Sequence, residues 1–188
     1  YKAYADNLPI EQNVLRESCD LLAGEGETRG SQWINRYVNV LRWIALAVLT
    51  GQDEFHIRQI FELVGNKNQD RLLDYLAYKL LPGWGKLTDK VLYPDAYGPL
   101  LKAIDGPAEE AAENVKTFLD NWYEAMDDTD WIDNHECEVE FGYWDYYVGY
   151  WAVEAALVVK VFGINDELFW EHEYYPRYLV HGRDPDNA

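Results

Sequence analysis

The sequence feature that most constrains the fold is the segment from Tyr143 to Phe162, which is apolar on almost every side when drawn as a helix. Its large apolar side chains follow one another at intervals of three and four, the period of an α-helix. The faces beside this stripe are hardly more polar, and a helix that is apolar nearly all round is one that other helices surround. We therefore expect a buried central helix whose large side chains hold the fold. These are Trp144, Val148, Trp151, Ala155, Val158 and Phe162.

Helix signals recur in the first half of the chain. Pro9 suits the first position of a helix, and Ser31 suits the cap of a second helix, whose apolar stripe runs to Gly51. Asp53 and Asp70 are each followed by apolar residues at helical spacing, so each is expected to cap a shorter helix. This half of the chain is therefore expected to be helical.

The region from Pro82 to Pro107 is rich in glycine, proline and tyrosine, which predicts an irregular connector with a turn or two of helix at Leu100 to Ile104. A further helix is expected from Pro107 to about Met126. The connector is the expected boundary between two sequential halves, residues 1–105 and 106–188, packed as one unit. The predicted fold class is all-α, a bundle of about seven helices.

Glu154 interrupts the apolar run of the expected central helix. A lone carboxylate would be costly there, so we expect it to accept a hydrogen bond from a buried arginine of another helix. Arg42 is the first candidate because apolar residues flank it on both sides, and Arg36 is the second. This interpretation is structural, and a catalytic role for Glu154 is not favoured.

The distribution of charge is strongly one-sided. The chain has 34 acidic and 16 basic residues, a formal net charge of −18. Phosphate backbones and anionic membranes attract basic surfaces, so neither nucleic acid nor a membrane is expected as a partner. Between Lys116 and Lys160 there is no Lys or Arg, while Asp and Glu occur eleven times. A field of one sign suits a basic protein partner.

Aromatic and aliphatic residues are interleaved with the acidic residues of this cation-free block, a mixture typical of protein-binding surfaces. We therefore predict that part of the block binds a partner protein. The alternative is a solvated loop, the commoner fate of a charge run. The residues expected on the partner-binding surface are Asp127, Asp128, Asp130, Trp131, Asp133, Glu136, Glu138 and Glu140.

Sequence motifs for cofactor binding, metal binding or catalysis are not found. There is no phosphate-binding loop, no glycine-rich dinucleotide motif and no nucleophile elbow. His135, Glu136 and Cys137 could begin a zinc site, but no second Cys/His pair follows at ligand spacing. Cys19 and Cys137 lie far apart in the sequence and do not have the spacing of a disulfide framework. We interpret them as two reduced thiols of a cytosolic protein. We expect a cytoplasmic binding protein that has no cofactor or metal and is not an enzyme.

The C-terminal third carries a recognisable set of residues: Gly149, Tyr150, Trp151, Glu154, Ala155, Phe162, Gly163, Ile164, Asp166, Tyr174, Tyr175, Pro176, Leu179 and Val180. Over residues 142–181 the chain resembles the C-terminal half of the PoNi family, bacterial immunity proteins that neutralise PoNe-type DNase toxins of polymorphic and type VI secretion systems. The resemblance implies an α-helical protein that binds its cognate toxin in the cytoplasm and blocks the nuclease. Because a DNase presents a positive surface to phosphate, a strongly acidic inhibitor is complementary to it. An acidic adaptor or chaperone for another basic protein is the alternative.

Overall fold

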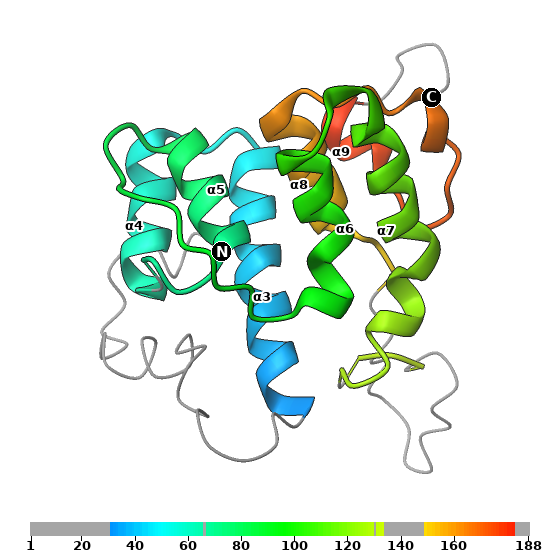
Figure 1. The fold of residues 1–188 in the computed structure, drawn as a ribbon, viewed down its shortest axis with the longest axis horizontal. Helices are drawn as coiled ribbons and strands as arrows, with labels where there is room; N and C mark the ends of the chain where they lie inside the picture. The colour runs from blue at the N-terminus through cyan, green and yellow to red at the C-terminus, as the bar shows by residue number, and fades with distance from the viewer. Residues whose placement is uncertain (1–30, 66, 130, 134–148, 183–188) are drawn as a thin grey trace.

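The computed structural model describes residues 31–65, 67–129, 131–133 and 149–182, with the backbone alone for residues 31–33. These residues form seven α-helices and two short 3-10 helices, and none of them lies in a β-strand. The prediction of an all-α fold is confirmed. The expected helix at Pro9 lies outside the described residues. The elements are α3 (Ser31–Leu49), α4 (Glu54–Val64), α5 (Arg71–Leu80), α6 (Pro94–Asp105), η1 (Ala108–Glu110), α7 (Ala111–Ala125), α8 (Val153–Phe162), η3 (Glu167–Phe169) and α9 (Arg177–His181) (Figure 1).

Two helices begin at the caps that the sequence predicts. The carboxylate of Asp53 accepts a hydrogen bond from the backbone N–H of His56 at 2.8 Å, at the beginning of α4. The carboxylate of Asp70 accepts one from the N–H of Leu73 at 3.0 Å, at the beginning of α5. Each side chain satisfies a backbone donor that the first turn of a helix leaves without an internal partner.

The glycine- and proline-rich connector contains a complete helix, α6, where a turn or two was predicted. Pro94 stands at its first position, where the missing N–H costs nothing, and Pro99 lies inside the helix. Burial of one face against α7 outweighs the low helix propensity of proline and glycine, to which the sequence interpretation gave too much weight. The buried residues of that face are Ala96, Tyr97, Leu100, Leu101 and Ala103.

The central helix is shorter than predicted. α8 begins at Val153, and residues 149–152 before it are not helical. The backbone N–H of Ala152 donates to a carbonyl of the C-terminal segment at 2.9 Å, so this stretch is bound to that segment and does not continue the helix. Trp151 therefore precedes the first turn and is 57% exposed, and the prediction that it is buried is wrong. Trp144 lies outside the described residues.

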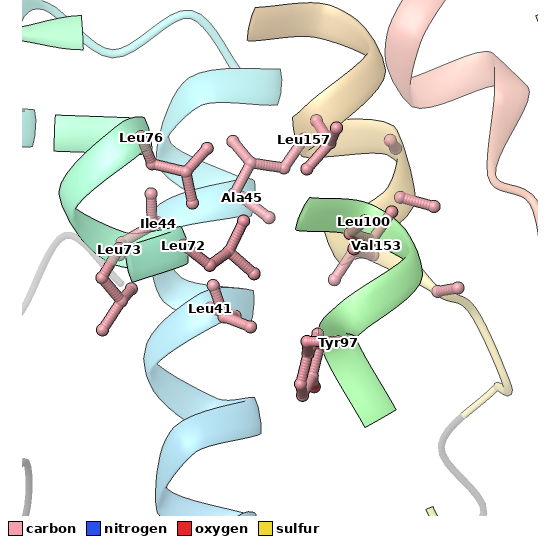
Figure 2. Packing of buried hydrophobic residues seen from close by; sticks show 14 of the residues in the cluster. Leu41, Ile44, Ala45, Leu72, Leu73, Leu76, Tyr97, Leu100, Val153 and Leu157 are labelled. Carbon is pink, nitrogen blue, oxygen red and sulfur yellow. The ribbon is translucent and has the colours of Figure 1, made fainter. Parts of the chain in front are cut away.

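From Val153 to Val159 the central helix is buried, as predicted, whereas Lys160 is exposed and Val161 and Phe162 are only partly buried. Every residue from Val153 to Val159 is inaccessible to solvent or nearly so. α8 contacts α3, α5, α6, α7 and α9, and Figure 1 shows it inside the bundle. Figure 2 shows apolar side chains of α3, α5, α6 and α8 gathered in one core, among them Leu41, Leu72, Leu100 and Leu157. This core positions the surfaces described below.

The predicted boundary between the two halves falls inside a helical hairpin. α6 ends at Asp105, α7 begins at Ala111, and the two helices pack against each other. Buried residues before and after this point belong to the same hydrophobic cluster. The division into residues 1–105 and 106–188 stays a prediction.

Candidate functional site

Glu154 lies in the core, 1% exposed, in the first turn of α8. The hydroxyl of Tyr97 in α6 donates a hydrogen bond to its Oε1 at 3.5 Å. Its Oε2 has no hydrogen-bond partner among the described residues. Burial raises the pKa of Glu154 to about 6, and the charge of Arg42 opposes that rise. The carboxyl group is therefore poorly solvated and incompletely compensated.

Arg42 contacts a different group from the one predicted. Its guanidinium lies over the ring of Trp131, 4.2 Å from the ring centroid, which is a cation–π contact. Within the described part of the chain, no hydrogen bond or ion pair joins it to Glu154. The prediction is right about which cation acts on Glu154. It is wrong about the hydrogen bond, because the donor is Tyr97 and the guanidinium faces the indole.

Trp131 belongs to a cluster of aromatic rings beneath the end of α7. It is 8% exposed, and its ring centroid lies 5.4 Å from that of Trp122 and 6.1 Å from that of Tyr150. Tyr123 and Tyr174 continue the cluster, with ring centroids 5.7 Å apart. The sequence places Trp131 on the partner-binding surface. The structure places its ring inside, where it supports that surface from below.

The acidic turn that follows α7 carries three exposed carboxylates, those of Asp127, Asp128 and Asp133. Thr129 closes the turn by binding the carbonyl of Met126 at the end of α7. Its N–H donates to this oxygen at 2.8 Å and its hydroxyl donates at 2.6 Å. Asp133 accepts a hydrogen bond from the hydroxyl of Tyr123, which raises the pKa of that hydroxyl. The other carboxylates predicted for this surface lie outside the described residues: Asp130, Glu136, Glu138 and Glu140.

A groove, here called the α6–α7 groove, lies between the beginning of α3, the segment that leads into α6, and the end of α7. Figure 1 shows all three on the lower side of the view. The volume of the groove is about 580 Å³, within the range of clefts that bind organic ligands. Its apolar lining comes from Ile34, Leu92, Pro94, Ala96 and Ala125.

Three exposed carboxylates also border the α6–α7 groove, those of Asp95, Glu124 and Asp128. In the part of the chain that the structure describes, none of the three belongs to an ion pair. Glu124 belongs to the cation-free block, and its spacing of four from Asp128 is a sequence signal that could have identified it. Asp95 comes from the connector, and no sequence signal places it beside the other two.

Trp151 is a second surface feature that the sequence interpretation missed. The preceding residue, Tyr150, packs against Tyr123 with ring centroids 5.2 Å apart, and Tyr123 in turn binds Asp133. The backbone that carries the exposed indole is therefore anchored to the acidic turn through the rings of Tyr150 and Tyr123. Exposed tryptophan is among the residues enriched in protein-binding hot spots.

Several residues of the C-terminal motif bind one another. The hydroxyl of Tyr175 donates to Oδ2 of Asp166 at 2.6 Å, and Nε2 of His181 lies 2.7 Å from the same oxygen. Burial raises the pKa of the Tyr175 hydroxyl. The ammonium group of Lys160 donates to the carbonyl of Val180 at 3.0 Å. These contacts fasten the C-terminal segment to α8, so these residues hold the fold.

Among the residues with described positions, no group of three or more histidine, cysteine or acidic side chains is arranged to hold a metal ion. None of the helices in the described ranges is both long and apolar enough to cross a membrane.

The fold and the candidate site define an all-helical protein that presents an acidic surface and an acidic groove at one end of its bundle. A family model described as PoNe immunity proteins (PoNi), C-terminal, matches residues 68–179. Because the match covers more than half of the chain, the chain belongs to the PoNe immunity protein family. The resemblance noted in the sequence is confirmed.

A solved structure extends the likeness in fold. The crystal structure of protein PA2201 from Pseudomonas aeruginosa matches with a TM-score of 0.57 and 22% sequence identity. The match covers 79% of this chain and 51% of that chain, so this chain spans about half the length of that protein. At this level of identity the likeness shows a shared fold. No curated protein matches the chain.

Proposed function

We propose that this protein binds and inhibits a cognate secreted DNase toxin of the PoNe type, and that its acidic surface is complementary to the basic nuclease. Membership of the immunity family supports the inhibitory role. The observation that carries the rest is the group of exposed carboxylates at the end of α7, which have no described cationic partner. A DNase gathers lysine and arginine to hold phosphate. An acidic protein is attracted to that same surface.

In this proposal the protein acts in the cytoplasm by binding, and it catalyses no reaction. The exposed ring of Trp151 is proposed as an aromatic contact with the toxin, and the buried ring of Trp131 supports the acidic surface from within. The carboxylates that we propose face the toxin are those of Asp127, Asp128, Asp130, Asp133, Glu136, Glu138 and Glu140.

Growth rescue tests the inhibitory role. Cells that express the toxin encoded beside this protein should grow when the protein is co-expressed, and purified protein should stop DNA cleavage at about one equivalent of toxin, because a tight inhibitor is consumed stoichiometrically. Failure both to rescue growth and to inhibit cleavage would overturn the proposal. Binding that leaves the nuclease active would indicate an adaptor or chaperone instead.

Association kinetics test the placement of the surface. We compare Asp127→Asn/Asp133→Asn with the control Glu109→Gln/Glu110→Gln, which removes equal charge from exposed positions at the other end of the α7 hairpin. Asparagine keeps the oxygen that accepts from Tyr123. The first variant should associate with the toxin about tenfold more slowly at low salt, with a smaller effect at high salt, and the control should change less. An association rate equal to wild type would refute this placement and leave the immunity role intact.

A further inference from the structure

The α6–α7 groove combines an apolar lining with acidic edges. Ile34, Pro94 and Ala125 contribute apolar surface, and Asp95 and the pair at the end of α7 contribute carboxylates from two different elements. A lysine or arginine side chain has the same division, because its stem is apolar and its head is charged. The groove thus matches a long basic side chain in polarity and charge.

A second groove lacks an acidic excess. It lies beside α4, has a volume of about 460 Å³, and is lined by Arg58, Lys67 and Trp84 together with one acidic residue, Glu62. Arg58 is paired with Glu54 at 2.9 Å, and Glu62 balances Lys67, so this lining offers a basic group no net attraction. The charge of the lining therefore separates the two grooves, and the α6–α7 groove is the one of the pair that suits a basic partner.

We propose that the α6–α7 groove receives an arginine of the cognate toxin, carried on a segment that lies along the end of α7. This inference rests on the proposed function, because the basic partner is the nuclease. Arginine fits better than lysine, since its planar guanidinium has five donors and can bind two carboxylates at once. None of the three carboxylates at the groove belongs to an ion pair among the described residues, so within that part of the chain no ion pair has to break when the guanidinium enters.

The groove and the acidic turn act on different steps of binding. Exposed charges at the rim of an interface act mainly on the association rate, whereas charges that become buried against a partner act mainly on the dissociation rate. Asp127 and Asp133 are rim charges in this scheme. Asp95 and Glu124 become covered when the toxin segment fills the groove, so their removal should shorten the lifetime of the complex.

The charge test compares two triple variants that remove equal charge. The groove variant is Asp95→Asn/Glu124→Gln/Asp128→Asn, and the control is Glu109→Gln/Glu110→Gln/Glu113→Gln on exposed positions at the beginning of the α7 hairpin. With a catalytically inactivated form of the toxin encoded beside this protein, the groove variant should dissociate at least about tenfold faster than wild type, at high as well as low salt. The control should dissociate within about twofold of wild type.

A steric test leaves the charge unchanged. Ala125 and Ala112 are half-buried residues on α7, and of the two Ala125 lines the groove. Ala125→Phe should fill the groove and weaken toxin binding at least about tenfold, while Ala112→Phe should bind as wild type does. Circular dichroism and thermal unfolding verify that each variant is folded.

The outcomes distinguish this inference from the proposed function. If the unaltered protein inhibits the toxin but the groove triple and Ala125→Phe dissociate at the wild-type rate, the groove assignment is overturned and the immunity role stands. If sedimentation shows a dimer of this chain that Ala125→Phe dissociates, a second copy occupies the groove and the assignment is likewise overturned. If the unaltered protein neither binds nor inhibits the toxin, both conclusions fall.

Discussion

Replacement of Glu154 by glutamine should change stability in a pH-dependent way. Compared with wild type, the variant should be more stable at neutral pH than at acidic pH. The pKa of this buried carboxyl rises from 4.5 in the unfolded chain to about 6 in the fold, chiefly because burial disfavours its charge. At 1.36 kcal/mol per pH unit, this difference corresponds to about 2 kcal/mol. The native state therefore binds this proton more tightly than the unfolded state does.

The direction of the pH effect follows from linkage. Because the native pKa lies above the unfolded value, the contribution of Glu154 to stability is fully present below about pH 4.5 and is lost as pH rises through about 6. Glu154→Gln cannot ionise but keeps an oxygen that can accept from Tyr97. The unfolding free energy of the variant minus that of wild type should therefore increase by about 2 kcal/mol between pH 4.5 and pH 7.5.

Urea unfolding followed by tryptophan fluorescence, at a series of pH values, measures this difference. Burial also raises the pKa values of Asp70 and Asp74, but these groups titrate in both proteins and cancel. Exposed Glu124→Gln is the control, and its difference from wild type should stay nearly flat over the window. A flat difference for Glu154→Gln would refute the reasoning. A loss of about 3 to 5 kcal/mol at neutral pH would instead indicate a broken buried ion pair with Arg42.

Two further comparisons, both measured by chemical denaturation, separate buried from exposed side chains. Asp70→Ala should lower the unfolding free energy by about 3 kcal/mol or more, because it leaves the buried hydroxyl of Tyr37 and the buried N–H of Leu92 without their acceptor. The cap substitution Asp53→Ala, at an exposed position, should cost about 1 kcal/mol. Trp122→Ala should cost about 3 to 5 kcal/mol, and exposed Trp151→Ala less than about 1 kcal/mol. Equal losses within either pair would contradict the assigned burial.

Local signals in the sequence were sufficient where a helix depends on its own residues. The caps at Asp53 and Asp70 needed no knowledge of the rest of the chain, since each side chain binds a donor three residues away. Only a turn or two of α6 is predicted from the sequence, because proline and glycine have low helix propensity. In the structure, burial of α6 against α7 outweighs the low helix propensity of its proline and glycine residues.

Other features depend on contacts between distant segments, and the sequence carries no signal for them. The beginning of α8 is decided where the N–H of Ala152 binds the carbonyl of Tyr174, so helical spacing alone could not show that Trp151 lies outside the helix. The α6–α7 groove likewise joins Ile34, Asp95 and Glu124 from three separate elements. Such a surface exists only after the helices have packed.

The contact between α3 and α8 has a consequence for how the protein is made. α3 ends at Leu49 and α8 begins at Val153. The ribosome therefore synthesises α3 to α7 before α8, the helix that packs against α3, emerges. Contacts between segments this distant close late, and nascent chains expose apolar surface until then. A chain that terminates before Val153 would leave α3 and α5 without their cover and be open to proteolysis. The core that α3 and α5 share with α8 can therefore close only after α8 has been translated.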